Sequence, residues 1–329
     1  MENIGITTTV PVEIIFAAGY KPIDLNNVFI TSKSSSLYIE NAEKSGFPRT
    51  TCSWIKGIYS ACMKLQIKKV IAVIQGDCSN THALSEILQT NGIEIIPFAY
   101  PYDKDEKTLN HEILKLIDNL GTTWEAVMDV KKNLDINVRR KLNLIDSYTW
   151  KDNLVHGEEN HYYLVNSSDF NGNYIKFEDK IDDFIKEIKK RDKILKKIRI
   201  GYIGVPSVFT DLYEYIESLG GHIVFNEIQR QFSMPYNTSN MIEQYLLYTY
   251  PYSIFVRIED IREAINSRKI DGIINYVQTF CFRHMEDIIL RKRLNIPLLT
   301  IEGDKPGNLD ARTKIRLETF MEMLKQNKH

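Results

Sequence analysis

The sequence predicts an α/β protein of two domains, each built around a parallel sheet. The chain has 329 residues, of which 43% are hydrophobic and 26% are charged. That is enough apolar material for two domain-sized cores. Short apolar runs alternate with helical patterns, which is typical of parallel sheets made from βαβ units. The apolar runs also fall into two groups, which a long polar stretch separates.

The first group of apolar runs predicts the strands of an N-terminal sheet. We expect strands over residues 3–9, 68–75 and 93–100. Helical patterns cover residues 11–19 and 53–66, between the first two strands. Each predicted strand is short and apolar, and the strands alternate with helices as in βαβ units.

The second group repeats the same pattern in the C-terminal part of the chain. The predicted strands cover residues 197–204, 221–228, 271–278 and 296–303. The predicted helices between or beside them cover residues 208–221, 253–269 and 284–295. Two such groups predict two Rossmann/flavodoxin-like domains with parallel sheets.

The polar stretch between the groups, residues of about 102–196, has apolar residues at three- and four-residue spacing, as in "LNHEILKLIDNL". This spacing predicts amphipathic helices. We therefore expect an N-terminal α/β domain over residues 1–196, with this helical segment as its extension. A C-terminal α/β domain is expected over residues 197–329.

Charge and hydropathy exclude several classes of partner. The formal net charge is −1, so bulk charge gives no reason to expect a nucleic-acid partner. No run approaches the roughly 18 apolar residues that a membrane helix needs. The N-terminal segment "MENIGITTTVPVEIIFAAGY" has no basic region, and Glu13 interrupts its apolar part. We expect no signal peptide and a cytoplasmic protein.

The four cysteines fall into two kinds of setting. Cys78 and Cys281 each follow a predicted strand and precede a predicted helix. Ligands bind beyond the carboxyl ends of parallel strands, and helix N-termini favour thiolates. Cys52 also lies at a predicted helix start. Cys62 is ten residues further along that helix, about 15 Å away at 1.5 Å per residue, so we assign it to packing.

Three cysteines from both domains could therefore meet in the cleft between the domains. Thiolates hold iron–sulfur clusters, usually four to a cluster, and three would leave one iron open to another ligand. Zinc is the alternative, although structural zinc sites usually show close pairs such as C-x-x-C, which this chain lacks. A role as small buried hydrophobes also stays open, because dispersed spacing does not decide between these uses.

Several segments together resemble the 2-hydroxyacyl-CoA dehydratase D-component family. That family includes subunits of ATP-dependent benzoyl-CoA reductases and the double-cubane-cluster reductases. The resemblance covers most of the chain except the helical middle, where little is diagnostic. The segments that carry it are "TTTVPVEIIFAAGYKPIDLNNVFI", "FPRTTCSWIKGIYSACM", "VIQGDCSNTHAL", "IDGIINYVQTFCFRHMEDIILRKRLNIPLLTIEGD" and "ARTKIRLETFMEML".

The resemblance implies an oxygen-sensitive [4Fe-4S] cluster in the interdomain cleft, with Cys52, Cys78 and Cys281 as its ligands. It also implies an anaerobic enzyme that receives single low-potential electrons from a separate ATP-dependent activator with its own [4Fe-4S] cluster. In a dehydratase, which is a lyase, the electron forms a ketyl radical on the thioester of a 2-hydroxyacyl-CoA. In a reductase the electron enters an aromatic ring or another reluctant acceptor. The open iron could coordinate a substrate oxygen.

The resemblance leaves the assembly open. Dehydratases pair two unlike homologous subunits, whereas a homodimer would bring two clusters together, as in the double-cubane reductases. One sequence does not distinguish a homologous partner subunit from a second copy of the chain. The chain is also shorter than typical dehydratase subunits, which leaves the presence of a substrate-covering segment open.

No catalytic residue is assigned, but Glu13, His82 and His284 are candidates. Glu13 begins a helix that is otherwise apolar. His82 and His284 follow Cys78 and Cys281 closely, where they could donate hydrogen bonds to sulfur or substrate. Ser79 and Asn80 are better interpreted as helix caps.

Two other functions remain as hypotheses. A nucleotide-binding oxidoreductase would use Gly201, Gly204 and Glu227, but the third glycine of its fingerprint is missing and Pro206 occupies the turn. A non-enzymatic electron carrier or ligand-binding module would also suit two α/β lobes around a cleft.

Overall fold

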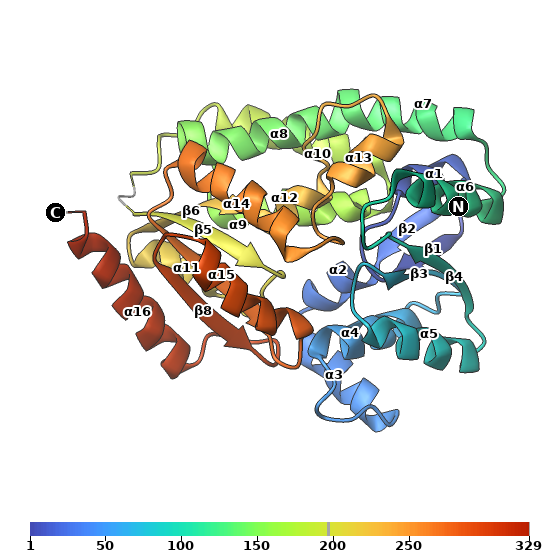
Figure 1. The fold of residues 1–329 in the computed structure, drawn as a ribbon, viewed down its shortest axis with the longest axis horizontal. Helices are drawn as coiled ribbons and strands as arrows, with labels where there is room; N and C mark the ends of the chain where they lie inside the picture. Colours follow the sequence, from blue (N-terminus) through green and yellow to red (C-terminus); the bar gives the residue numbers. More distant parts are fainter. Residues whose placement is uncertain (196–197, 329) are drawn as a thin grey trace.

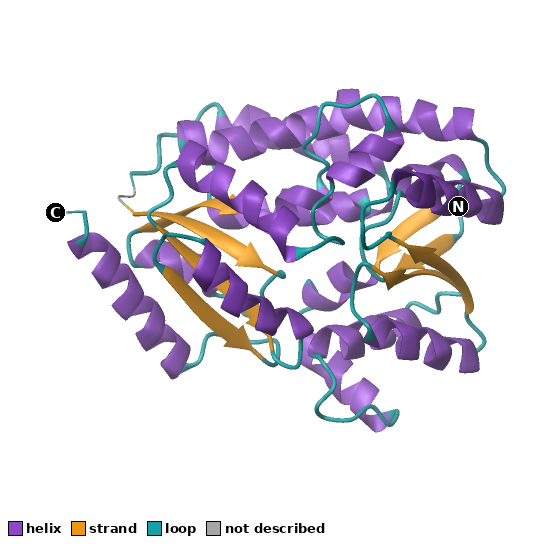
Figure 2. Ribbon diagram, viewed as in Figure 1, coloured by secondary structure: helices purple, strands orange, loops and turns teal. Residues whose placement is uncertain are grey.

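The computed structural model describes residues 1–195 and 198–328. It contains two separate four-stranded sheets with helices around both (Figures 1 and 2). All strand pairings within the two sheets are parallel. The predicted α/β fold class is thus confirmed. The predicted domain boundary between residues 196 and 197 lies outside the described residues.

The first sheet has the strand order β2-β1-β3-β4. Its third strand in sequence, β3, reads KVIAVIQ, and Val70 to Val73 are fully buried, because helices cover both faces of the sheet. The short strand β2 was not expected: it contains Pro22 and only four residues. The strands are β1 (Asn3–Ile6), β2 (Lys21–Asp24), β3 (Lys69–Gln75) and β4 (Glu94–Ala99).

The second sheet has the order β6-β5-β7-β8, which is the same arrangement with each strand four numbers higher. Strand β6 ends at Asn226, two residues before the predicted end, and a helix begins at Glu227. The strands are β5 (Ile198–Gly204), β6 (Gly221–Asn226), β7 (Gly272–Gln278) and β8 (Leu298–Gly303).

The helices of the first half include three that were predicted, α1, α4 and α5, and two that were not, α2 and α3. Asp24 caps α2, since its side chain accepts a hydrogen bond from the Asn26 amide, a frequent device at helix starts. The helices are α1 (Val12–Ala17), α2 (Leu25–Ile30), α3 (Ser35–Lys44), α4 (Ser53–Lys64) and α5 (Asn80–Thr90).

The middle segment is helical, as expected. The last of these helices, α10, ends at Ile188. The helical run α7–η1–α8–η2 lies along both halves (Figure 1). The elements are α6 (Glu106–Leu120), α7 (Trp124–Leu134), η1 (Asp135–Arg139, π-helical), α8 (Arg140–Ser147), η2 (Tyr148–Asp152, π-helical), α9 (Gly157–Val165), the 3₁₀ turns η3 (Asn166–Ser168) and η4 (Phe170–Gly172), and α10 (Tyr174–Ile188).

The middle segment also contacts the second sheet directly. The Asn226 side chain, at the end of β6, donates to the Gly157 carbonyl of α9 over 3.1 Å. His222 Nε2 lies 2.9 Å from the Thr149 carbonyl in η2. The segment therefore packs on both halves of the molecule.

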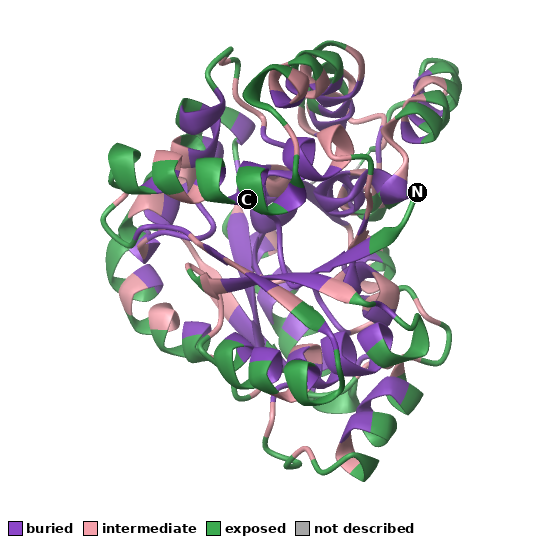
Figure 3. Cartoon of the chain, turned by 90° about the vertical axis from the view of Figure 1, so that its right-hand side faces the viewer, coloured by how far each residue is buried: buried purple, intermediate pink, exposed green. Residues whose placement is uncertain are grey.

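The helices of the second half agree with the predicted pattern around β7 and β8, while α12 and α13 were not expected. Their bounds are α11 (Leu212–Ser218), α12 (Glu227–Phe232), α13 (Met241–Leu247), α14 (Ile254–Arg268), the 3₁₀ turn η5 (Phe282–Glu286), α15 (Asp287–Arg293) and α16 (Ala311–Gln326). Figure 3 shows buried strands inside and exposed outer helix faces.

The core of the first half includes residues from the second half of the chain. Tyr245, Tyr248 and Met241 are fully buried in the same apolar cluster as Ile4 and Ile6 of β1. We call residues 228–252 the crossing segment, because the chain leaves the second sheet after β6 and covers the first. No helix within the described residues is long and apolar enough to cross a membrane.

Candidate functional site

A cavity of about 100 Å³ lies where the carboxyl ends of the two sheets face each other. This is the position at which α/β folds bind ligands. Its lining comes from both halves: Thr7, Thr8, Asp24, Asn26, Asn27, Ile30, Cys52, Trp54, Ile55, Ile58, Asp77, Cys78, Val165, Val205, Pro206, Phe232, Tyr250, Gln278, Phe280, Cys281, Phe282 and Arg283.

Three of the four cysteines line this cavity. Cys78 and Cys281 occupy equivalent places, because each follows the third strand of its sheet and each strand ends in glutamine, Gln75 or Gln278. Cys52 is the N-cap residue of α4. The structure thus brings together the three cysteines that the sequence analysis singled out.

Gly76 shapes the turn that presents Cys78. Its φ is +93°, a conformation that glycine adopts without strain. A Cβ here would lie 2.8 Å from Tyr100 Cβ and 2.9 Å from Pro251 Cβ. The turn therefore packs against Pro251 of the crossing segment. Any side chain at position 76 would force the turn and the crossing segment apart. Cys62, in contrast, is fully buried in the core around α4, as expected.

Opposing effects act on the three thiols. Burial raises the pKa of Cys52 to about 12 and that of Cys78 to about 11, and it raises the pKa of Cys281. Backbone N–H groups at the helix starts lower these pKa values. The donors are the amides of Trp54 for Cys52, Asn80 for Cys78 and Arg283 for Cys281. Such amides stabilise the thiolate, the form that binds metal.

The donor set fits an iron–sulfur cluster better than a single ion. Within residues 1–195 and 198–328, no three His, Cys, Asp or Glu side chains are placed to hold one metal ion. The thiolates of a [4Fe-4S] cluster each bind a different iron, so they need not converge on one point. Zinc instead takes four ligands that converge on one ion.

Trp54 adds a second observation. Its indole Nε1 is buried, and among the described residues it has no hydrogen-bond partner, although Trp54 lines the cavity. Buried donors without partners are rare and costly. A sulfur or oxygen acceptor bound in the cavity would satisfy this group.

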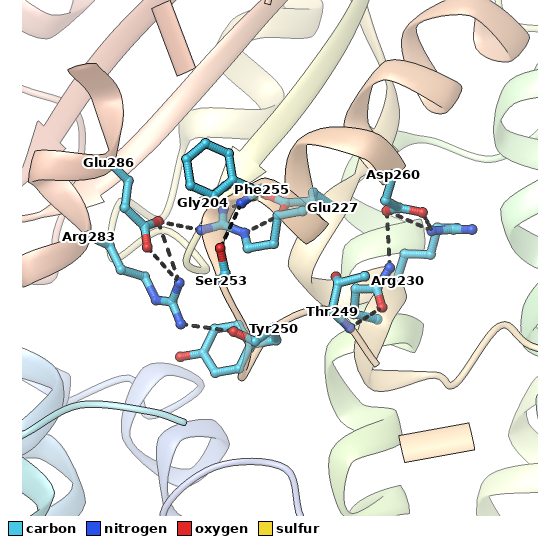
Figure 4. Close-up of polar contacts among 12 residues, drawn as sticks. Gly204, Glu227, Arg230, Thr249, Tyr250, Ser253, Phe255, Asp260, Arg283 and Glu286 are labelled. Atoms are coloured by element: carbon cyan, nitrogen blue, oxygen red, sulfur yellow. Dashed lines mark hydrogen bonds and ion pairs between the residues drawn. The ribbon is translucent and has the colours of Figure 1, made fainter. Parts of the chain in front are cut away.

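A chain of ion pairs begins at Arg283 of the cavity lining and leads into the second half of the molecule (Figure 4). Arg283 donates to the Tyr250 carbonyl over 3.0 Å, and its guanidinium lies 4.5 Å from the centre of the Tyr250 ring. Glu286 accepts from Arg283 at 3.3 Å and from Arg257 at 2.5 Å. Arg257 also binds Glu227 through two hydrogen bonds of 2.7 and 2.9 Å. Two cations and two carboxylates thus balance each other.

Glu227 has no oxygen free for a ligand in this arrangement. Its Oε2 also accepts from the Gly204 amide at 3.1 Å, and the side chain is fully buried. The residue that would contact the ribose in the nucleotide-binding hypothesis is therefore bound inside the protein.

Two carboxyl groups of the cavity lining have no ion-pair partner among the described residues: Asp24 and, beside Tyr250, Asp77. Asp24 is 4% exposed and lines the cavity. Its Oδ2 accepts from the Ser168 hydroxyl over 2.6 Å, and its amide donates to Asp169 Oδ2 over 2.8 Å. Asp77, also in the lining, accepts from the Tyr250 hydroxyl over 2.8 Å.

Burial raises the pKa of all three acids. It raises the pKa of Asp169 to about 7, with the charge of Asp24 as the next cause. It also raises the pKa of Asp24 and of Asp77, against the hydrogen bonds from Ser168 and Tyr250. Asp24 and Asp169 were not predicted as site residues, because they are 145 residues apart in the chain. The local signal near Asp24 is the pattern "PIDLNN", which indicates a helix cap.

Glu13, the first catalytic candidate, lies outside the cavity. It is fully buried and accepts from Arg139 at 2.7 Å, Gln244 at 2.8 Å and Tyr245 at 2.7 Å. Burial acts to raise its pKa, but Arg139 and these hydrogen bonds hold the pKa of Glu13 below its ordinary value. The geometry is that of an ion pair joining α1, η1 and α13.

The two histidine candidates are exposed. His82 lies on α5 away from the cavity lining. His284 lines a recess on the outer side of Cys78 and Cys281, where Phe280, Phe282, Met285 and Ile288 are also exposed. Ser79 stands at the N-cap position of α5, but its side chain makes no capping hydrogen bond.

A family model described as 2-hydroxyglutaryl-CoA dehydratase, D-component, matches residues 7–324. No curated protein matches the chain.

Proposed function

Because the chain belongs to the 2-hydroxyglutaryl-CoA dehydratase D-component family, we propose that it is an iron–sulfur enzyme subunit. It binds a [4Fe-4S] cluster through Cys52, Cys78 and Cys281, and it acts on an acyl-CoA or a similar small substrate. The observation that carries the proposal is that these three thiols, from three separate elements and both halves, line one cavity.

The cluster would supply single-electron transfer and a Lewis-acidic iron, for dehydration of a 2-hydroxyacyl thioester or reduction of a related acceptor. The chain's own residues have three tasks. The cysteines hold the cluster, with the Trp54 indole N–H as a donor to the bound group. Apolar residues such as Ile55 and Phe232 keep water out. The Tyr250 hydroxyl orients Asp77, whose carboxyl can hold a proton inside the cavity.

The electrons come from a separate ATP-dependent activator, and the subunit pairs with a homologous subunit or with a second copy of itself. Support for a protein partner comes from the recess outside Cys78 and Cys281. There Met285 and Ile288 are 69% and 61% exposed, and exposed apolar groups that gather beside a site are typical of interaction surfaces.

Anaerobic purification tests this function. The expected product is a brown protein with roughly four irons per chain, whose turnover of a 2-hydroxyacyl-CoA depends on the reduced activator and ATP. A colourless protein after anaerobic reconstitution with iron and sulfide would contradict the proposal.

A further inference from the structure

The cavity lining contains more acidic than basic side chains. Besides its cysteines and Tyr250, the described lining contains Asp24, Asp77 and the one basic residue Arg283. Arg283 is already engaged with Glu286 and the Tyr250 carbonyl. The two aspartates have no such ion pair, and Asp169 places a third carboxyl directly behind Asp24.

The remaining lining is neutral. Apolar side chains form much of the wall, and the polar ones are uncharged hydrogen-bonding groups. All of these except Gln278, at the end of β7, gather where β1 and β2 end. The apolar members are Ile30, Trp54, Ile55, Ile58, Val165, Val205, Pro206, Phe232, Phe280 and Phe282; the neutral polar ones near the strand ends are Thr7, Thr8, Asn26 and Asn27. Such a wall suits an apolar chain with one or two hydrogen-bonding groups.

A carboxylate in this cavity would be costly. It would leave water without gaining an unengaged cation, because Arg283 already pairs with Glu286 and its charge also acts on Asp77. A buried charge without a partner is strongly unfavourable. An ionised Asp24 would repel it at low effective dielectric. A protonated Asp24 would offer one hydrogen bond but no charge, so neither form of Asp24 replaces the missing cation.

From this balance we infer that the cavity accepts the acyl part of a thioester substrate only when that part is uncharged, and that Asp24 excludes acyl groups ending in a carboxylate. The inference rests on the proposed function, because it takes an acyl-CoA as the ligand. Selectivity of this kind comes from a repulsive element rather than from a new attractive contact.

Three CoA thioesters of equal chain length test the inference: pentanoyl-CoA, glutaryl-CoA and the neutral amide 5-amino-5-oxopentanoyl-CoA. Each is titrated into the anaerobically prepared full-length chain by calorimetry, with free CoA as reference. We expect glutaryl-CoA to bind at least about tenfold more weakly than the other two, the ratio that 1.4 kcal/mol produces. The amide separates the effect of charge from that of polarity.

The variant Asp24→Asn keeps an acceptor for the Asn26 amide and removes the charge. It should narrow the difference in affinity between glutaryl-CoA and the amide by about threefold or more. Asp118→Asn, at an exposed position on α6, should leave the gap unchanged.

The outcomes separate the two claims. Glutaryl-CoA binding as tightly as pentanoyl-CoA would overturn the inference and leave the proposed function standing. Binding of all three thioesters no tighter than free CoA would overturn the proposed function and, with it, the inference. An unchanged gap in a folded Asp24→Asn protein would reject Asp24 as the determinant; the wild-type comparison decides the rest even if that variant does not fold.

Discussion

Each half of the molecule has a carboxylate where its edge strand ends, and the two carboxylates have different partners. Asp24 ends β2, Glu227 follows β6, and these two strands occupy the same edge position in their sheets. Glu227 is held by Arg257 and by the Gly204 amide. Asp24 has only neutral hydrogen-bond partners and lines the cavity. A repeated fold thus yields a neutral supporting side and an acidic, ligand-facing side.

The cysteines do not follow this division. Cys78 and Cys281 follow the equivalent strands β3 and β7, so each half contributes one thiol from the same place in its sheet. Cys52 is the additional thiol, and it comes from the first half. The halves are therefore alike where they offer thiols and unlike where they offer carboxylates.

The largest expected effect tests the likeness of the thiols. Cys78→Ser and Cys281→Ser should each lower the iron content of the anaerobic protein from roughly four per chain to near zero, because each removes one of only three thiolate ligands. Iron analysis and the visible absorption of the purified protein measure this.

Cys62→Ser is the matched control, because Cys62 lies in the core and away from the cavity. It should keep the iron. Full iron content in either cavity variant would show that the two halves do not contribute equivalent ligands.

The next effect contrasts the two carboxylates. Glu227→Gln leaves the buried Arg257 without its main partner, so it should lower the free energy of unfolding by about 3–5 kcal/mol. Asp24→Asn should change it by about 1 kcal/mol or less, since a buried acid without a cation gains little from its charge. Urea titrations measure both. Equal losses in the two variants would mean that Asp24 is a structural residue like Glu227.

The acidic side should also give the protein a distinct pH dependence. The pKa of Asp169 is raised to about 7 in the folded protein. Protonated Asp169 therefore makes its full contribution to the free energy of unfolding only below its unfolded pKa of about 3.9. That contribution is lost as pH rises through the folded pKa. Going from pH 4 to pH 8, ionisation of Asp169 should lower the free energy of unfolding by on the order of 4 kcal/mol.

Urea titrations of Asp169→Asn at both pH values check this, because the variant should lose less stability than the wild type on going to pH 8. The comparison with wild type removes the contributions of all other groups. Identical pH profiles would show that Asp169 ionises normally in the folded state.

The smallest expected effect concerns Trp54. Trp54→Phe keeps the ring contacts but removes the unpartnered N–H, so stability should change by less than about 1 kcal/mol. If the N–H donates to a bound cluster, its loss should make the reduction potential more negative, because hydrogen bonds to sulfur stabilise the reduced form. An unchanged potential, measured by redox titration with electron paramagnetic resonance, would assign Trp54 to packing alone.

Sequence reasoning located the strands that are long and apolar, and it located the thiols, because both signals are local. It missed β2, since four residues with a proline carry no strand pattern. It extended β6 to residue 228, because Ile228 continues an apolar run that the chain uses to enter α12 instead.

The sequence did not predict the acidic side of the cavity, for a different reason. Asp24 and Asp169 meet only because β2 and the turns after α9 pack together. Likewise, Glu13 was a catalytic candidate from its place at the start of an apolar helix, and nothing near it in the chain indicates its ion pair with Arg139, 126 residues away. Pairings of this kind depend on tertiary packing rather than on local pattern.

The crossing segment has a consequence for dissecting the protein. Residues 228–252 come late in the chain but complete the apolar core of the first sheet, and Pro251 supports the turn that presents Cys78. A fragment that ended near residue 195 would expose the faces that Tyr245 and Tyr248 cover. Separately expressed halves are therefore expected to be insoluble alone and to recover a folded state only when mixed.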